Sequence, residues 1–369
     1  MNRESIERPL LIKTVKGTPK FLKRKMRSLL FIISYYVKIP DIIVFLLSKR
    51  IDKWPYIILL YHRIVEENTT YLNKGPVVQH KISHFENEVK YLKKHYQVMN
   101  IDELIRRMQH GLECIKPCIS ITFDDGYLDN YEFAYPILKK YGVPATIYLA
   151  TSLIGTNGRT WTDQIEFAMI ETKKEHFILP ELFGEKTIRV RTRIEKEKAN
   201  IKIAEALKLI PDEKRRELMR KLFKTLDIDE NAVNGKSRRM LNWEEVEKMA
   251  NDGITIGSHG HTHSVLSKMS VNKAKEDILT SKKIIEEKLG IEVKHFSFPN
   301  GREEDFSEEL MDYCQKIGFK SVASVVYGMN DPFNGNVFSI KRIGAHSPVW
   351  MMAGELFREI VRWYLKSKI

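Results

Sequence analysis

The sequence predicts an α/β protein, a deformed (β/α) barrel with a helical insertion. Apolar runs alternate with segments of helical periodicity along much of the 369 residues, and continuous apolar runs are typical of strands buried on both faces of a parallel sheet. Polar residues gather directly after several of these runs, as they do at the carboxyl ends of barrel strands. Residues of about 155–240 break the alternation and are rich in Lys, Arg and Glu at helical spacing, so we assign the insertion to them.

The first half of the predicted barrel, which we place at residues 54–350, begins with an apolar run. Phe85, Val89 and Leu92 recur after it at helical spacing. The predicted elements follow in this order: a strand at 55–60, a helix at 82–96, a short strand at 98–101, a helix from residue 102, a strand at 119–123, a helix at 131–141 closed by Gly142, and a strand at 143–149.

The second half begins after the insertion, where Asn242 and Glu245 have the spacing of an N-cap and its capping-box partner. A final amphipathic helix is predicted at 351–369. Between these points the predicted elements are a helix from residue 243, a strand at 253–257, a helix at 271–289, a strand at 293–298, a helix at 307–317 and a strand at 321–326.

Residues 1–53 form a basic, partly apolar segment. Its apolar runs, 28–37 and 42–47, are each shorter than the roughly 20 residues needed to cross a bilayer, and no small-residue cleavage site follows them. We expect short helices that either attach to an anionic membrane surface or pack on the barrel. The corresponding expectation for localisation is cytoplasmic or peripheral at the cytoplasmic membrane, with an extracytoplasmic position left open.

The composition indicates a folded protein, with 43% hydrophobic and 30% charged residues. The net charge of +13 indicates an anionic lipid surface or an acidic glycan as partner, or simply a lysine-rich surface. No helix-turn-helix, RRM or zinc-finger spacing is present, so we expect no nucleic-acid partner. The three cysteines, Cys114, Cys118 and Cys314, are too few for a disulfide framework, which suits a reducing compartment or indifference to it.

Two segments carry the chemistry. Asp124 and Asp125 follow an apolar run, and adjacent side chains in an extended or turning segment point in different directions. One carboxylate can therefore bind a metal ion while the other takes a proton from a bound water. His259 and His263 are four residues apart, so on a helical turn they would reach one ion while His261 pointed elsewhere. These groups make up a catalytic zinc site with its own general base.

With these two motifs the chain resembles the polysaccharide deacetylase family, also called carbohydrate esterase family 4 or the NodB-homology domain. The resemblance covers about residues 55–155 and 240–346. It implies the deformed (β/α) barrel of that family and an enzyme that removes acyl groups from amino sugars. By the match of Thr122–Gly126 to the first family motif, Asp124 is the implied catalytic base and Asp125 an implied metal ligand.

The His-x-x-x-His match implies His259 and His263 as the other two ligands of a zinc ion, although a site of this composition also accepts cobalt, nickel or iron. The third family motif is only partly kept. Ser297 stands where members often carry an arginine that orients the base, and Arg342 is a conceivable replacement.

Pro299 and Asn300 are expected to shape the substrate groove, and the Asn300 backbone N–H to stabilise the oxyanion. Two histidines compete for the role of general acid. His346 is slightly preferred because it comes where the last family motif is expected, whereas His62 also follows a barrel strand.

Three further side chains are expected to contact substrate, and these are Tyr127, Trp161 and His62. An aromatic face suits a sugar ring, but Trp161 is more simply explained by packing of the insertion on the barrel.

The sequence therefore predicts a metal-dependent hydrolase that removes N-acetyl or other acyl groups from amino sugars of a cell-envelope polysaccharide or its precursor. One alternative is a deacylase of a lipid-linked sugar at the membrane face, which the basic N-terminal segment favours. The other is an inactive glycan- or membrane-binding module, which the altered third motif favours. Retention of both aspartates and both histidines argues against the module, because a binder needs no general base.

Overall fold

The computed structural model describes residues 20–48, 51, 53–69, 72, 77–114, 116–234, 239–332 and 335–367. Within them, parallel strands run in the order β1-β12-β11-β10-β9-β6-β5, and β5 pairs back with β1 to close a barrel, which confirms the predicted fold. The barrel strands are β1 (Tyr56–Tyr61), β5 (Cys118–Phe123), β6 (Thr146–Leu149), β9 (Thr255–Ser258), β10 (His295–Ser297), β11 (Ser321–Tyr327) and β12 (Ile340–Gly344). Apart from the strands of the insertion, the described short strands outside the closed ring are β4 (Gln97–Val98) beside β5, and β2 (Arg63–Val65) paired with β3 (Gln79–Lys81).

The closing pair of strands determines where the first polar side chains meet. Every residue of β1 and β5 is buried, as expected for strands covered on both faces. Tyr61 lies opposite Phe123 in the parallel register. The next residues, His62 and Asp124, therefore leave the barrel side by side, and the Asp124 backbone N–H donates to the Tyr61 carbonyl at 3.1 Å.

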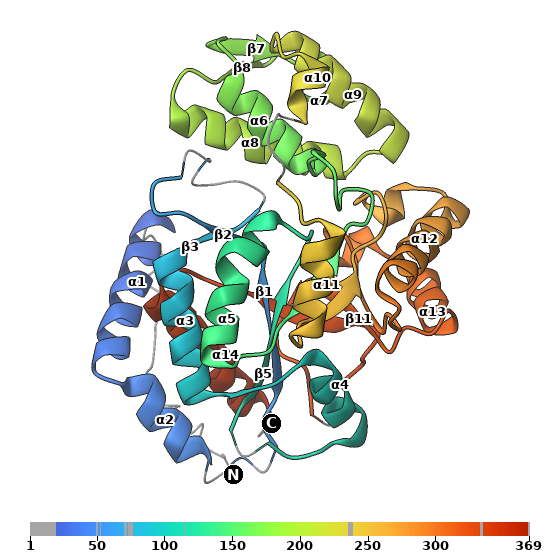
Figure 1. Cartoon of the computed structure of the whole chain (residues 1–369). Coiled ribbons are helices and arrows are strands. Elements are labelled where there is room, and N and C mark those ends of the chain that lie inside the picture. The colour runs from blue at the N-terminus through green and yellow to red at the C-terminus, as the bar shows by residue number, and fades with distance from the viewer. Residues whose placement is uncertain are drawn as a thin grey trace, which may run out of the picture.

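Helices surround the barrel, as Figure 1 shows. They are α3 (Ile82–His95), α4 (Ile101–His110), α5 (Tyr135–Tyr141), α11 (Trp243–Asn251), α12 (Val271–Leu289), α13 (Glu308–Lys316) and α14 (Val349–Lys366), with short turns η1 (Asn130–Ala134), η2 (Leu266–Lys268) and η3 (Glu303–Asp305). The predicted capping box is present, because Asn242 Oδ1 accepts from the Glu245 N–H at 2.8 Å and Glu245 Oε2 accepts from the Asn242 N–H at 2.9 Å. The helix predicted at 131–141 instead begins with the π-helical turn η1.

The insertion lies beyond the barrel in Figure 1 and has its own hydrophobic core. It contains α6 (Trp161–Glu171), β7 (His176–Ile178), α7 (Pro180–Phe183), β8 (Thr187–Arg189), α8 (Arg193–Lys208), α9 (Asp212–Thr225) and α10 (Glu230–Val233). The sequence analysis missed the antiparallel pair of β7 and β8. Phe177 and Ile188 face each other there and are buried, but strands of three residues are too short for an alternating pattern to stand out.

Two N-terminal helices, α1 (Lys20–Tyr36) and α2 (Ile39–Ser48), pack against α14. A Cβ at Gly354 of α14 would lie 2.3 Å from Phe31, so the absence of a side chain there lets α1 approach closely. No single helix in the described ranges is long and apolar enough to cross a membrane, but Lys25–Tyr36 and Ile39–Leu47 pass that test together across a bend of 72°. Residues 1–19 of the predicted segment lie outside the described residues.

The cysteines correct one expectation. Cys114, which lies between α4 and β5, and Cys118, the first residue of β5, are joined in a disulfide, and Cys314 is buried and free. The disulfide links two cysteines only four positions apart and closes a local loop. The number of cysteines in the chain does not indicate such a local link.

Candidate metal and catalytic site

The three implied metal ligands come together at the carboxyl ends of β5 and β9. Asp125 Oδ1 lies 2.9 Å from His263 Nε2 and 3.3 Å from His259 Nε2. One potential ligand atom from each residue lies within 4.8 Å of the other two, and all three residues are buried. Asp125 Oδ1 accepts no hydrogen bond from the described part of the chain. A buried carboxylate oxygen facing two imidazole nitrogens fits a divalent transition metal with an open coordination position.

The electrostatics of this cluster favour the ionised carboxylate. Burial raises the pKa of Asp125, but the charge on His263 and the close contacts with both histidines outweigh it, so the pKa lies well below its usual value. His259 Nδ1 lies 2.8 Å from the Ser297 carbonyl oxygen, which places the ring proton on Nδ1. Nε2 is thereby left with its lone pair for a metal ion.

The histidines do not lie on a helical turn, which corrects the predicted geometry. The segment after β9 is an irregular loop, and His263 has a φ of +55°. The loop is held by Asp277 of α12, which accepts from the backbone N–H groups of His261 and Thr262 at 2.7 and 2.9 Å, and from Thr262 Oγ1 at 2.6 Å. These N–H groups bond a carboxylate instead of a preceding carbonyl, so the helix does not form.

His261 points away from the cluster, as predicted. Its Nδ1 lies 2.9 Å from Thr151 Oγ1.

The second aspartate, Asp124, faces a different partner. Arg342 of β12 forms two hydrogen bonds to it, Nη1 to Oδ1 and Nη2 to Oδ2, both at 2.7 Å. Arg342 Nη2 also donates to Ser297 Oγ at 2.8 Å. Burial raises the pKa of Asp124, but Arg342 and His259 outweigh it and lower the pKa. Arg342 therefore occupies the position of the base-orienting arginine that Ser297 lacks, as the sequence suggested.

The two candidate general acids lie in different surroundings. Burial lowers the pKa of His62, and the charges of Asp125, Asp124 and His259 act on it, so His62 lies near the candidate ligands. Burial also lowers the pKa of His346. The charged groups near His346 are instead Glu355, His80, Arg27 and Arg358, and none of these belongs to the cluster.

Two residues that the sequence analysis missed hold His62 in place. Asn130 Nδ2 donates to the His62 carbonyl at 2.8 Å. Asp129 accepts from Arg63 Nε at 2.8 Å and from the Ile64 N–H at 3.2 Å. Both residues follow the aspartate motif closely and lie at the π-helical turn, a feature that often marks functional sites. In the sequence, the signal for these two residues is that a polar pair, Asp129 and Asn130, directly precedes the predicted helix at 131–141.

The turn at Pro299 and Asn300 borders the histidine loop. Asn300 has a φ of +61°, and the Gly301 N–H donates to the Pro299 carbonyl at 2.8 Å. Pro299 Cγ would lie 3.5 Å from a Cβ at Gly260. Both residues are thus near the cluster, and the role of the Asn300 N–H as an oxyanion donor stays a prediction.

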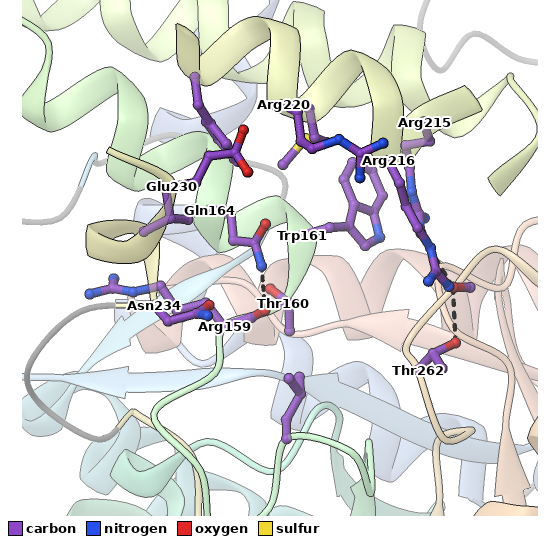
Figure 2. A pocket seen from close by; sticks show the side chains of 15 residues that line it. Arg159, Thr160, Trp161, Gln164, Arg215, Arg216, Arg220, Glu230, Asn234 and Thr262 are labelled. Atoms are coloured by element: carbon purple, nitrogen blue, oxygen red, sulfur yellow. Dashed lines mark hydrogen bonds between the residues drawn. The ribbon is translucent and has the colours of Figure 1, made fainter. Parts of the chain in front are cut away.

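The two aromatic candidates differ. Tyr127 is fully buried with the Arg63 guanidinium 4.8 Å from its ring, so its ring has no exposed face for a sugar, and the expected contact with substrate is wrong. Trp161 belongs to the core of the insertion and also lines a cavity beside the histidine loop, which Figure 2 shows.

The polysaccharide deacetylase family model matches residues 113–209 and 212–322, more than half of the chain. The chain therefore belongs to the polysaccharide deacetylase family.

Individual relatives match over shorter stretches. YxkH of Bacillus subtilis, named after the same family, is 36% identical over 110 residues, which are 30% of this chain and 37% of that protein. The poly-β-1,6-N-acetyl-D-glucosamine N-deacetylase of Staphylococcus aureus is 39% identical over 74 residues, 20% of this chain and 25% of that protein. The chain thus spans well under half the length of these relatives.

Two solved structures have a similar fold. The deacetylase PplD of Streptococcus pyogenes has a TM-score of 0.53 at 17% identity, covering 84% of this chain and 99% of that one. IcaB of Ammonifex degensii has a TM-score of 0.52 at 16% identity, covering 83% and 98%. At these identities the likeness establishes the barrel fold.

Proposed function

We propose that this chain is a metal-dependent N-deacetylase of an amino-sugar glycan. One observation carries the proposal. Three potential ligands surround one point, and a fourth buried group, Asp124, lies 3.8 Å from His259 Nε2 while its carboxylate is fixed by Arg342. Zinc is the first candidate for the ion, with cobalt, nickel or iron as alternatives. When bound, such an ion polarises an amide carbonyl and lowers the pKa of a water molecule.

The roles of the protein groups follow from their positions. Asp125, His259 and His263 would hold the ion. Asp124 would accept a proton from the attacking water, and because Arg342 already holds its carboxylate, little reorganisation is needed. His62 would donate a proton to the leaving amine, for which its position beside the strand end that carries Asp124 is suitable.

The name of the Staphylococcus aureus relative supports a poly-N-acetylglucosamine type of glycan as substrate. We therefore take β-1,6-linked N-acetylglucosamine oligosaccharides as the first substrates, and chitooligosaccharides as a comparison of linkage. The alternative of an inactive binding module leaves the buried Asp124–Arg342 pair without a use.

The test combines metal content with acetate release for wild type, Asp124→Asn and a matched control, Asp312→Asn, whose side chain is exposed on α13. Wild type and control should bind about one metal ion and release acetate. Asp124→Asn should keep the metal and lose turnover by a factor of at least about 100, the range of a general base. Wild type that retains no metal after incubation with zinc would contradict the proposal.

We also propose that α1 and α2 attach the enzyme to an anionic membrane surface. The inner face of α1 is anchored through Phe31 against Gly354, while Leu29, Leu30 and Ile33 are half or more exposed. A helix fixed on one side with bare apolar residues on the other suits an interfacial position. The charge of +13 favours anionic lipid, and a lipid-linked sugar would then be within reach as an alternative substrate.

Cosedimentation with vesicles tests this attachment. Wild type should pellet with vesicles containing phosphatidylglycerol and less with pure phosphatidylcholine. Leu30→Glu should weaken pelleting at least tenfold, whereas Ile194→Glu, at a residue equally exposed on the insertion (64%), should not. Equal losses in both variants, or no pelleting of wild type, would contradict membrane attachment.

For localisation we propose the extracytoplasmic side of that membrane. The Cys114–Cys118 disulfide supports it, because such links persist mainly in oxidising compartments. Thiol labelling of the protein taken directly from cells tests the proposal: an intact disulfide supports it, and two free thiols at these positions contradict it.

A further inference from the structure

A cavity of about 400 Å³ lies between the insertion and the loop that carries His263. Thr262 and Ser264, the two chain neighbours of this potential metal ligand, line it, together with residues of α6, α9 and α10. Adjacent Cα atoms are about 3.8 Å apart, so the wall of the cavity begins one residue from the metal site. A glycan bound at the metal could therefore extend into it.

The cavity is strongly basic. Its described lining contains four arginines, namely Arg159, Arg215, Arg216 and Arg220. One carboxylate, Glu230, belongs to the same lining, and Asp212 forms ion pairs with two of the arginines, Arg215 and Arg216. Positive charge therefore exceeds negative charge in the cavity.

Arg215 is a buried cation with an incomplete set of partners. It forms an ion pair with Asp212, donates to Ser264 Oγ at 3.2 Å and lies 4.8 Å from the centre of the Trp161 ring. Its Nε has no acceptor among the described residues. Asp212 also pairs with Arg216, Nε to Oδ2 at 2.9 Å. One carboxylate therefore forms ion pairs with two guanidinium groups, that of the buried Arg215 and that of the half-exposed Arg216.

Arg220 adds a third positive charge from the same helix. It lies four residues after Arg216, and like charges at this spacing on a helix repel each other. The described residues provide no ion pair to Arg220. In Figure 2, Glu230 lies at the end of the cavity away from Arg215 and Arg216, with Trp161 between, so this carboxylate is not placed beside those two arginines.

We propose that this cavity binds a phosphate group of the glycan, adjacent to the amino sugar that is deacetylated. The inference rests on the proposed deacetylase function and adds the class of substrate. Guanidinium groups form paired hydrogen bonds with phosphate oxygens, and an anion between Arg216 and Arg220 relieves their repulsion. The hydroxyl groups of Thr160, Thr262 and Ser264 are suitable partners for the remaining phosphate oxygens and for sugar hydroxyls.

Such a phosphate has two chemical sources. It can belong to a phosphodiester within the glycan, or to the diphosphate that joins a sugar to a lipid carrier. The cavity recognises the group that both share, so the substrates of the test have to separate them.

The test compares kcat/KM of the zinc-loaded full chain on a neutral N-acetylglucosamine oligosaccharide and on the same oligosaccharide carrying a phosphodiester next to the reacting sugar. Wild type should prefer the phosphodiester at least tenfold. Arg220→Gln should reduce kcat/KM for the phosphodiester about tenfold, mainly through KM, and change the neutral substrate less than twofold. The control is Lys224→Gln, an exposed lysine on the same helix outside the cavity lining, which should alter neither substrate.

A third substrate, polyprenyl diphosphate-linked N-acetylglucosamine in vesicles, separates the two sources. Faster turnover of this substrate than of the phosphodiester identifies a lipid carrier, and slower turnover identifies a polymer. No preference of wild type for either phosphate-bearing substrate, or equal losses of Arg220→Gln on neutral and charged substrates, overturns the inference while the deacetylase function stands.

If no substrate is hydrolysed, the deacetylase proposal fails, and binding of inorganic pyrophosphate decides on the cavity separately. Calorimetry should show binding to wild type and Lys224→Gln, and about tenfold weaker binding to Arg220→Gln. Equal binding by all three proteins, or none, overturns the assignment of a phosphate site.

Discussion

Replacing Arg342 by glutamine removes the guanidinium group that forms two short hydrogen bonds with the Asp124 carboxylate. The two side chains are 0% and 2% exposed, and their hydrogen bonds are both 2.7 Å long. The glutamine is shorter and neutral, so the carboxylate stays buried with Ser297 Oγ, 3.4 Å away, as its nearest remaining donor.

The expected loss of stability is large because the pair is buried. Removing one partner of a buried ion pair costs about 3–5 kcal/mol, since the other charge is left without compensation. Arg106 provides a matched control. It forms a pair of the same two-point geometry with Glu103, at 2.8 and 2.9 Å, but is 53% exposed. Water replaces the partner there, so Arg106→Gln should be indistinguishable from wild type.

Urea unfolding followed by circular dichroism measures both effects. The double variant Asp124→Asn with Arg342→Gln should be destabilised by less than the sum of the two single variants, by about 2 kcal/mol, because no charge then remains buried and unpaired. An Arg342→Gln variant as stable as Arg106→Gln would refute the reasoning, as would simple additivity in the double variant.

Three further predictions concern the acid, the histidine loop and a buried carboxylate. His62→Gln should reduce turnover at least about 100-fold with metal content unchanged, whereas turnover of His346→Gln should stay within threefold of wild type. Acetate release that is lost in His346→Gln and kept in His62→Gln would make His346 the general acid. Asp277→Asn should weaken zinc binding about 10- to 100-fold in chelator competition, because an amide cannot replace a carboxylate that accepts three hydrogen bonds. Glu276→Gln, at an exposed residue of the same helix, should bind zinc like wild type. Equal zinc affinities of the two variants would contradict this. Burial raises the pKa of Glu166 to about 6, so the folded state holds this proton more tightly than the unfolded state and loses stability as the pH rises from about 4.5 through 6. Glu166→Gln should therefore gain about 2 kcal/mol relative to wild type between pH 4 and pH 8, and urea midpoints that stay parallel across this range would contradict the assignment.

The barrel could be predicted from the sequence because its signals are local and repeated. Each barrel strand before the insertion is a largely apolar and fully buried run, and helix ends such as the one at Asn242 carry their own capping residues. The strand β12 was missed because Arg342 and Lys341 interrupt it. Arg342 is fully buried, and only the three-dimensional contacts of its guanidinium explain a charge inside a strand.

The candidate site was predictable in its residue types but not in its geometry. The two aspartates and two histidines were found from their spacing. The loop conformation of His263 depends on Asp277, which follows it by fourteen positions on a different element. The proposal of His62 over His346 as the general acid depends on the closing of β1 on β5, a contact between strands far apart in the sequence. Neither relation leaves a local pattern.

The altered third motif is best understood together with Arg342. Ser297 lies on β10 and Arg342 on β12, with β11 between them, yet Arg342 Nη2 reaches both Ser297 Oγ and the Asp124 carboxylate. Its Nε is fixed by the Ser324 carbonyl at 2.7 Å. An arginine at position 297 would add a second guanidinium to this buried space against a single carboxylate, which is costly. A small residue at position 297 therefore leaves the space that the Arg342 guanidinium occupies beside Asp124. What matters for the base is where the guanidinium lies, and not which strand carries it, so the missing arginine in the third motif is no argument for an inactive module.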